Sequence, residues 1–200
     1  MVERPNESEW IHRAQQGDDD AFAMLVEAYQ VAVYNLCYRM LGNPMEAEDA
    51  AQETFLRAYK GLKRYDPERR FATWLLSIAS HHCIDRLRRR RFPIRSIDEL
   101  LPWQQKADDT PGPESTLTVK ESQEAVRKML EQLGDQDRAV LILRYWYDLS
   151  YEEIAQSLSS SVSAVKSRLH RARRQLAEQW IMHTSVEVGK QGRCDEASAF

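Results

Sequence analysis

LSYEEIA at residues 149–155 and VSAVKSRLHRARR at residues 162–174 together predict two short helices joined by a tight turn. Ser150 and Glu153 have the spacing of a capping box, in which each side chain bonds a free backbone N–H at the helix start. The serine run 159–161 then interrupts the helical pattern, and Ser161 or Ser163 can cap the next helix.

The second of these helices is apolar on one side and cationic on the other. Val162, Val165 and Leu169 recur at helical spacing, and no carboxylate appears before Glu178. A helix of this kind suits the major groove of DNA, so the pattern predicts a DNA-binding helix-turn-helix. A solvated basic helix in a bundle is the alternative.

Composition indicates a globular chain. Of its 200 residues 42% are hydrophobic and 30% are charged, and the formal net charge is −3. No apolar run approaches the roughly 20 residues that a membrane span requires, and the polar, acidic segment 1–10 does not resemble a secretory signal. Cys37, Cys83 and Cys194 lack metal-ligand spacing, which is typical of a reducing compartment. We therefore expect a cytoplasmic protein without direct membrane insertion.

Helical periodicity continues through most of the remaining sequence. It predicts a helix over about 22–40 that ends at Gly42, a helix over about 45–62, and a third that starts near Phe71 and stops at Pro93. Further helical patterns end at Gly134 and extend over about 139–146. The fold class we predict is all-α, with two small helical domains joined by a flexible linker.

Changes in composition set the predicted boundaries. The stretch 96–120 contains prolines and acidic residues and few apolar ones, which is typical of a linker. We expect a first domain at 1–95, this acidic linker at 96–120, a second domain at 121–180 and a polar tail at 181–200.

The predicted third helix ends in an arginine run. Arg86, Arg88, Arg89, Arg90 and Arg91 repel one another, which weakens an isolated helix. A polyanion would remove this cost and would gain affinity from counterion release. A solvated surface run is the alternative. Together with the basic helix of the second domain, the run indicates two DNA contacts on one chain.

At this point the residues resemble a known family. AEDAAQETFLRAY at 47–59, FATWL at 71–75 and DRLR at 85–88 resemble region 2 of bacterial RNA polymerase sigma factors. SYEEIA at 150–155 and VKSR at 165–168 resemble region 4. With regions 2 and 4 alone, the chain is similar to the extracytoplasmic-function (ECF) group of sigma factors.

The resemblance implies a function and partners. The chain would bind core RNA polymerase through the β and β′ subunits and direct promoter-specific transcription initiation, without catalysis of its own and without cofactor or metal. Promoter DNA and an anti-sigma factor would be its other partners. Implied contacts to the −10 element are Arg69, Arg70, Phe71, Trp74, His81, Arg86, Arg88, Arg89 and Arg90. Implied contacts to the −35 element are Ser163, Lys166, Ser167, His170, Arg171 and Arg174, with Arg168 facing back toward its domain. Implied contacts to core polymerase are Asp49, Gln52, Glu53, Phe55 and Leu56.

Two departures from the family pattern affect the −10 contacts. Primary sigma factors carry two adjacent tryptophans where this chain has Trp74-Leu75, so we expect weak intrinsic melting of the promoter. The ECF group often has asparagine where this chain has His81, so we expect a shifted −10 preference. A core position for Trp74, and for one of Phe55 and Leu56, stays open.

Two other classes of function explain less of the sequence. A stand-alone helix-turn-helix regulator explains the second domain, but it leaves the helix at 49–59 and the arginine run without a purpose. An enzymatic function has no support, because the sequence contains no carboxylate cluster, P-loop or catalytic triad. His81, His82 and Cys83 cannot converge on one ion, because adjacent residues on a helix point about 100° apart.

Overall fold

The computed structural model describes the backbone of residues 6–91 and 117–197 and the side chains of residues 6–91 and 124–181. All regular structure in these ranges is helical, which confirms the predicted fold class. The elements are α1 (Glu7–Gln15), α2 (Asp19–Leu41), α3 (Pro44–Gly61), the 3-10 turn η1 (Leu62–Arg64), α4 (Phe71–Arg91), α5 (Leu117–Glu131), α6 (Asp135–Tyr145), α7 (Tyr151–Ser157) and α8 (Val162–Ala197).

The first domain is a bundle built around α2. Its N-terminus is capped by Asp18, whose carboxylate accepts a hydrogen bond from the backbone N–H of Ala21. Gly42 ends the helix at a φ of 75°, in the left-handed region that glycine adopts without strain. Asn43 caps α3 in turn, and Pro44 occupies the first turn of that helix. The predicted end of the first long helix at Gly42 is therefore confirmed.

The core of this domain holds α3 and α4 in place. Leu25, Leu36 and Met40 of α2 are fully buried, together with Leu75 and Leu76 of α4. Each such side chain contributes about 1.5–3 kcal/mol relative to an exposed one. Because α2 packs against both α3 and α4, the outer faces of these two helices are fixed relative to each other.

The second domain packs α6 and α7 against the first part of α8. The predicted capping box is present: the Ser150 hydroxyl accepts from the Glu153 N–H at 3.1 Å, and the Glu153 carboxylate accepts from the Ser150 N–H at 2.8 Å. The Ser161 hydroxyl accepts from the N–H of Ala164, so Ser161 rather than Ser163 caps α8. Ile154 and Leu169 close the core between the two helices.

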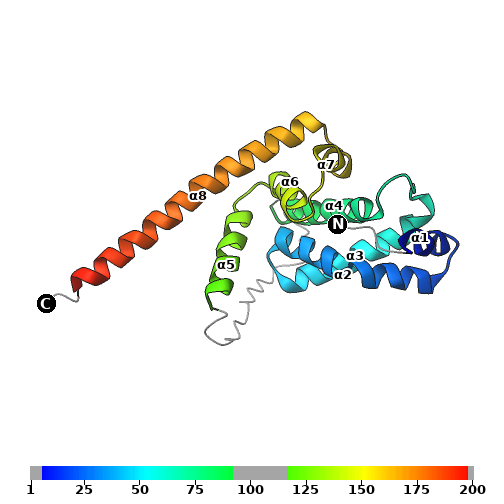
Figure 1. The fold of residues 1–200 in the computed structure, drawn as a ribbon, viewed down its shortest axis with the longest axis horizontal. Helices are drawn as coiled ribbons and strands as arrows, with labels where there is room; N and C mark the ends of the chain where they lie inside the picture. Colours follow the sequence, from blue (N-terminus) through cyan, green and yellow to red (C-terminus); the bar gives the residue numbers. More distant parts are fainter. Residues whose placement is uncertain (1–5, 92–116, 198–200) are drawn as a thin grey trace, which may run out of the picture.

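Three elements differ from the sequence-based expectations. Helix α1 precedes the first helix that the periodicity predicted, and it buries Ile11 and Ala14. Helix α5 begins at Leu117, inside the span assigned to the linker. Helix α8 continues to Ala197, through most of the expected tail, and Figure 1 shows it extending away from the other helices. Most of the predicted linker lies outside the described residues.

The two domains pack on each other (Figure 1). Helices α6 and α7 contact α4, and α5 and α6 contact α2. In the portion of the chain that the structure describes, no helix is long and apolar enough to cross a membrane.

Candidate nucleic-acid interface

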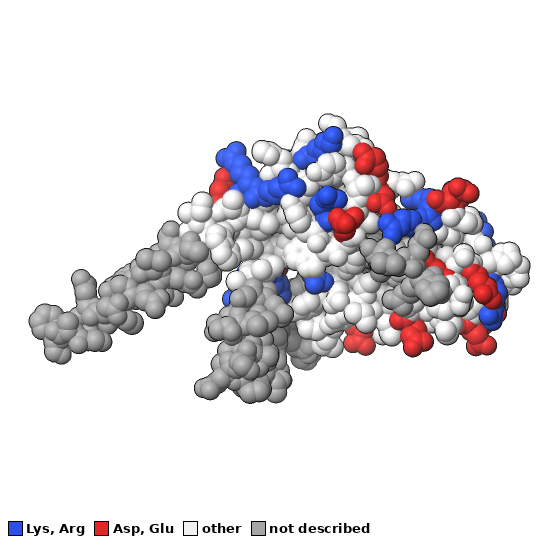
Figure 2. Space-filling model, in the orientation of Figure 1, with Lys and Arg blue, Asp and Glu red and all other residues white. Residues whose placement is uncertain are grey.

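The first part of α8 carries a solvent-facing set of polar and cationic side chains. Figure 2 shows Lys and Arg side chains gathered along the part of α8 nearest α7, with few acidic ones among them. Lys166 is exposed, and its Nζ lies 5.7 Å from the ring centroid of Tyr151. The predicted −35 contacts are all exposed: Ser163, Lys166, Ser167, His170, Arg171 and Arg174.

The arginines of α8 differ in how far they are engaged within the domain. Arg171 donates two hydrogen bonds, of 2.6 and 2.8 Å, to the carboxylate of Asp137, which is only 11% exposed. Arg168 donates to the side chain of Gln136, so it faces back toward its own domain. Arg174 pairs with Glu178 at 2.9 Å on the exposed face. The Arg171 guanidinium is therefore held mainly by its own domain.

The arginine run at the end of α4 is divided in the same way. Arg86 lies 3.4 Å from Asp49 and 3.7 Å from Glu46 of α3, and Arg90 pairs with Glu46. The other two arginines of the run that belong to the predicted −10 set, Arg88 and Arg89, are exposed and have no ion-pair partner among the described residues.

The loop before α4 touches the second domain. Arg70 lies 3.6 Å from the carboxylate of Glu153, and the Thr73 hydroxyl donates to the same carboxylate at 3.4 Å. Burial by itself raises the pKa of Glu153, but hydrogen bonds from Ser150 and the charge of Arg70 hold that pKa below its usual value. Arg69 is half-buried. The exposed His81 lies further along α4, with its Nδ1 2.9 Å from the carbonyl of Ser77.

The aromatic residues near this loop form a cluster. The Phe71 ring is 3% exposed and lies 5.5 Å, centroid to centroid, from the rings of Tyr29, Tyr65 and Trp74. The structure therefore places Phe71 in the core rather than on the predicted DNA-facing surface, because its ring fills the space between α2 and α4. Trp74 is half-buried, with its ring 4.9 Å from that of Tyr65, so it is partly a core residue.

The outer face of α3 carries the predicted polymerase contacts. Asp49 and Gln52 are exposed, and Glu53 accepts a 2.7 Å hydrogen bond from Arg57. Leu56 is 55% exposed, whereas Phe55 is half-buried against the core. One of these two apolar residues thus serves the core, the role that the sequence left open, and the other faces solvent.

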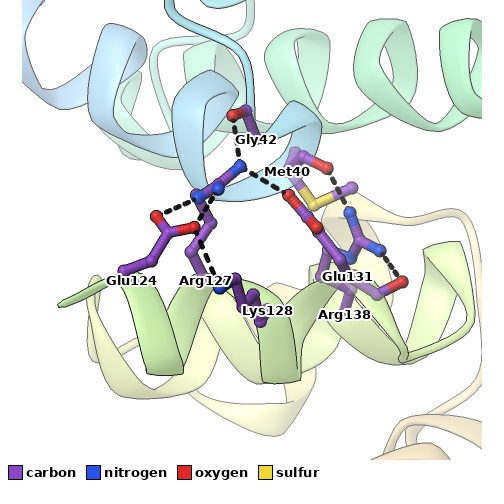
Figure 3. Close-up of polar contacts among 7 residues, drawn as sticks. All are labelled: Met40, Gly42, Glu124, Arg127, Lys128, Glu131 and Arg138. Carbon is purple, nitrogen blue, oxygen red and sulfur yellow. Dashed lines mark hydrogen bonds and ion pairs between the residues drawn. The ribbon is translucent and has the colours of Figure 1, made fainter. Parts of the chain in front are cut away.

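Sequence reasoning missed the polar contacts between the two domains, which Figure 3 shows in part. Arg138 is 3% exposed and donates to the carbonyl of Met40 at 2.5 Å and to that of Glu131 at 2.6 Å. Arg127 donates to the carbonyl of Gly42 at 3.0 Å and also to Glu124 and Glu131. Both guanidinium groups therefore bond backbone carbonyls at the C-terminal end of α2, where the helix leaves carbonyls without a helical partner and where cations are favoured.

Cysteine and metal chemistry has no support in the described parts of the chain. Cys37 and Cys83 are both buried. A hydrogen bond with Cys37, together with burial, raises the pKa of the Cys83 thiol well above its ordinary value, which keeps it protonated and unreactive. No group of three or more His, Cys, Asp or Glu residues in the described ranges could hold a metal ion.

Comparison with known families gives two matches, one in each domain. A family described as "Sigma-70 region 2" matches residues 25–92, and a family described as "Sigma-70, region 4" matches residues 123–176. The first match spans α3 and α4, and the second spans the helix-turn-helix.

Full-length relatives agree with these matches. The ECF RNA polymerase sigma factor SigW of Bacillus subtilis is 38% identical over 175 residues, which cover 84% of this chain and 94% of SigW. The RNA polymerase sigma-H factor of Pseudomonas aeruginosa is 33% identical over 179 residues, which cover 86% and 93% of the two chains.

Solved structures share the fold. CnrH, in complex with the cytosolic domain of CnrY, superposes with a TM-score of 0.67 at 24% identity, over 89% of this chain and 99% of that one. The sigma factor RpoE of Bartonella quintana, in complex with the anti-sigma factor NepR, gives a TM-score of 0.61 at 22% identity, over 80% and 96% of the two chains.

Proposed function

Because this chain belongs to the ECF group of bacterial RNA polymerase sigma factors, we propose that its two domains divide the work of promoter recognition. The first domain would bind core polymerase and the −10 element, and the second would bind the −35 element. The observation that carries this division is the presence of one exposed cationic helix surface in each domain, at the end of α4 and at the start of α8. The stand-alone regulator is disfavoured, because it gives α3 and α4 no purpose.

Contact with core polymerase is assigned to the outer face of α3. Asp49, Gln52 and Glu53 offer exposed or half-exposed polar groups, and Leu56 adds an exposed apolar side chain beside them. Protein interfaces combine an apolar centre with a hydrogen-bonding rim, which is the composition of this face. We assign the β and β′ subunits as the partners from the resemblance of AEDAAQETFLRAY to region 2.

Contact with the −10 element is assigned to α4 and the loop before it. Arg88 and Arg89 can each bind a DNA phosphate without breaking a described ion pair. The exposed His81 and the half-buried Trp74 provide planar groups on which an unstacked base can stack. Arg70 lies in the same loop and now contacts Glu153, so it can join them only after it leaves its present contacts within the protein.

Contact with the −35 element is assigned to α8. Lys166, Ser167 and His170 share its exposed face, at the N-terminal part of the helix that enters the groove in this motif.

An anti-sigma factor is the further partner that we propose. Support comes from the RpoE relative in fold, whose structure contains the anti-sigma factor NepR.

Run-off transcription with purified core polymerase tests this function. We expect specific transcripts only when the chain and core are both present, and only weak promoter binding by the chain alone. Asp49→Ala with Glu53→Ala should reduce core binding in gel filtration, whereas Glu48→Ala, an exposed residue on the same helix, should not. Tight, symmetric promoter binding without polymerase would contradict the proposal.

A further inference from the structure

A small hollow lies between α3 and α4, on the side where the arginine run begins. Its volume is about 220 Å³, and Arg57, His82, Asp85, Arg86 and Arg89 line it. This is several times the roughly 30 Å³ that one water molecule occupies in the liquid. The lining therefore brings three guanidinium groups to one small space and sets a single carboxylate, Asp85, against them.

The polar groups of the hollow are only partly satisfied. Arg57 pairs with Glu53, and Arg86 with Asp49 and Glu46, whereas Arg89 has no ion-pair partner in the described part of the chain. The Nε2 atom of His82 is buried and has no hydrogen-bond partner among the described residues. A buried polar atom without a partner costs about 1–3 kcal/mol, so a bound group that completes it is favoured.

The charge around His82 explains its protonation state. Burial first, and then the positive charges of Arg57 and Arg86, lower the pKa of His82, while the nearby carboxylates Glu53 and Asp85 oppose this shift. The ring is therefore neutral near pH 7. An anion in the hollow would offset the arginine charges, raise the pKa of His82 and convert both ring nitrogens to donors.

We propose that this hollow is a phosphate-binding site, in which Arg57, Arg86, Arg89 and the Nε2 atom of His82 hold one tetrahedral oxyanion. Several donors from two helices suit such a group, because its oxygens accept hydrogen bonds from several directions. Asp49 and Glu53 compete with an anion for this site, because they pair with Arg86 and Arg57 in the free chain. This last point rests on the proposed function: polymerase that engages Glu53 and Asp49 would release Arg57 for the phosphate and would leave Arg86 with Glu46 as its one remaining ion-pair partner among the described residues.

Titration of the full chain with inorganic sulfate, at constant ionic strength in chloride, tests the site. The His82 ring signals in NMR should shift with sulfate and saturate, and Arg57→Gln should abolish the saturable shift. Arg88→Gln, which lies outside the lining, should leave the shift unchanged. Glu53→Gln should tighten sulfate binding about two- to fivefold, as the loss of one competing exposed ion pair predicts, whereas Glu48→Gln should not.

Sulfate keeps both charges between pH 5 and 8, so any pH dependence reports the protein. Because the bound anion favours protonated His82, the affinity should rise as the pH falls through the pKa of that ring in the free chain. His82→Gln should retain a donor and lose this pH dependence.

The phosphate could belong to the DNA backbone or to a free phosphate compound, and the holoenzyme separates the two. If it belongs to promoter DNA, Arg57→Gln should reduce the slope of log K against log salt by about 0.9. If a free compound is the source, Arg57→Gln should abolish sulfate binding by the chain and leave this slope unchanged.

A His82 signal that does not respond to sulfate, or that responds equally in Arg57→Gln, would overturn the proposal. Loss of core affinity in Arg57→Gln without any sulfate response would assign the hollow to an acidic side chain of polymerase instead, and would also overturn it. If the unchanged chain supports run-off transcription but shows no sulfate response, the phosphate site is rejected and the proposed function stands. Loss of transcription with an intact sulfate response would reject the proposed function alone.

Discussion

Tyr147 shows how one buried hydroxyl joins the two domains. It is 9% exposed, and its hydroxyl donates to the carbonyl of Ala32 in α2 at 2.6 Å. Burial raises the pKa of Tyr147, so the hydroxyl stays a neutral donor. We expect Tyr147→Phe to reduce the free energy of unfolding by about 1 kcal/mol, the usual net value of one such bond. Urea unfolding would measure it against Tyr145→Phe, whose exposed hydroxyl bonds only Arg173 in the described ranges and should matter less.

Gly42 is required by the backbone. Its φ of 75° strains any residue with a Cβ, whereas the flexible end of the Glu131 side chain, which lies close to an added Cβ, could move aside. We expect Gly42→Ala to destabilise the protein by about 1–2 kcal/mol. Gly61→Ala is the matched control: that helical glycine would meet only the Trp74 ring at an ordinary 3.5 Å, and the change should be neutral or stabilising by up to about 1 kcal/mol. Equal losses in thermal unfolding would contradict this reasoning.

Helix α8 contains two kinds of cation that the sequence does not distinguish. Lys166 is exposed and lies over the Tyr151 ring, whereas Arg171 holds the nearly buried carboxylate of Asp137. We expect Lys166→Gln to lower the salt slope of promoter binding by about 0.9 without altering the urea midpoint. Arg171→Gln should lower the urea midpoint, because it leaves Asp137 without its ion-pair partner. The same slope change with no loss of stability in Arg171→Gln would show that this arginine serves DNA rather than the fold.

Most elements could be predicted because they depend on local signals. Gly42 and the Ser150–Glu153 capping box mark helix ends that need no tertiary information, and apolar spacing identifies α2, α4 and the helix-turn-helix. Helix α1 was not predicted, because its sequence is short and polar and the helix is stabilised by packing against α2. The partners of Arg86, Arg171 and Phe71 were also beyond sequence reasoning. Periodicity predicts the helix face on which a residue lies. The residue that it contacts depends on how α3 packs on α4 and how α6 packs on α8.

The contacts between the two domains are incompatible with simultaneous contact to both promoter elements. The −10 and −35 elements are centred about 25 base pairs apart, which is about 85 Å of B-form DNA. Two touching domains of this size have centres only about 30 Å apart. Arg138 and Tyr147, which bond carbonyls of α2, must therefore release them before both elements can be bound.

Pulsed EPR distances between spin labels would follow this opening. Labels at Met24→Cys in α2 and Gln156→Cys in α7, both exposed positions, report the separation of the domains in a chain that also carries Cys194→Ser. We expect one short distance in the free chain and a distance tens of ångströms longer in the promoter-bound holoenzyme. Arg138→Met with Tyr147→Phe should broaden the distribution in the free chain, because the buried hydrogen bonds that select one arrangement are lost, whereas Tyr145→Phe should leave it narrow. A short distance that persists on the promoter would mean that the domains engage DNA without separating, and the geometric argument would then fail.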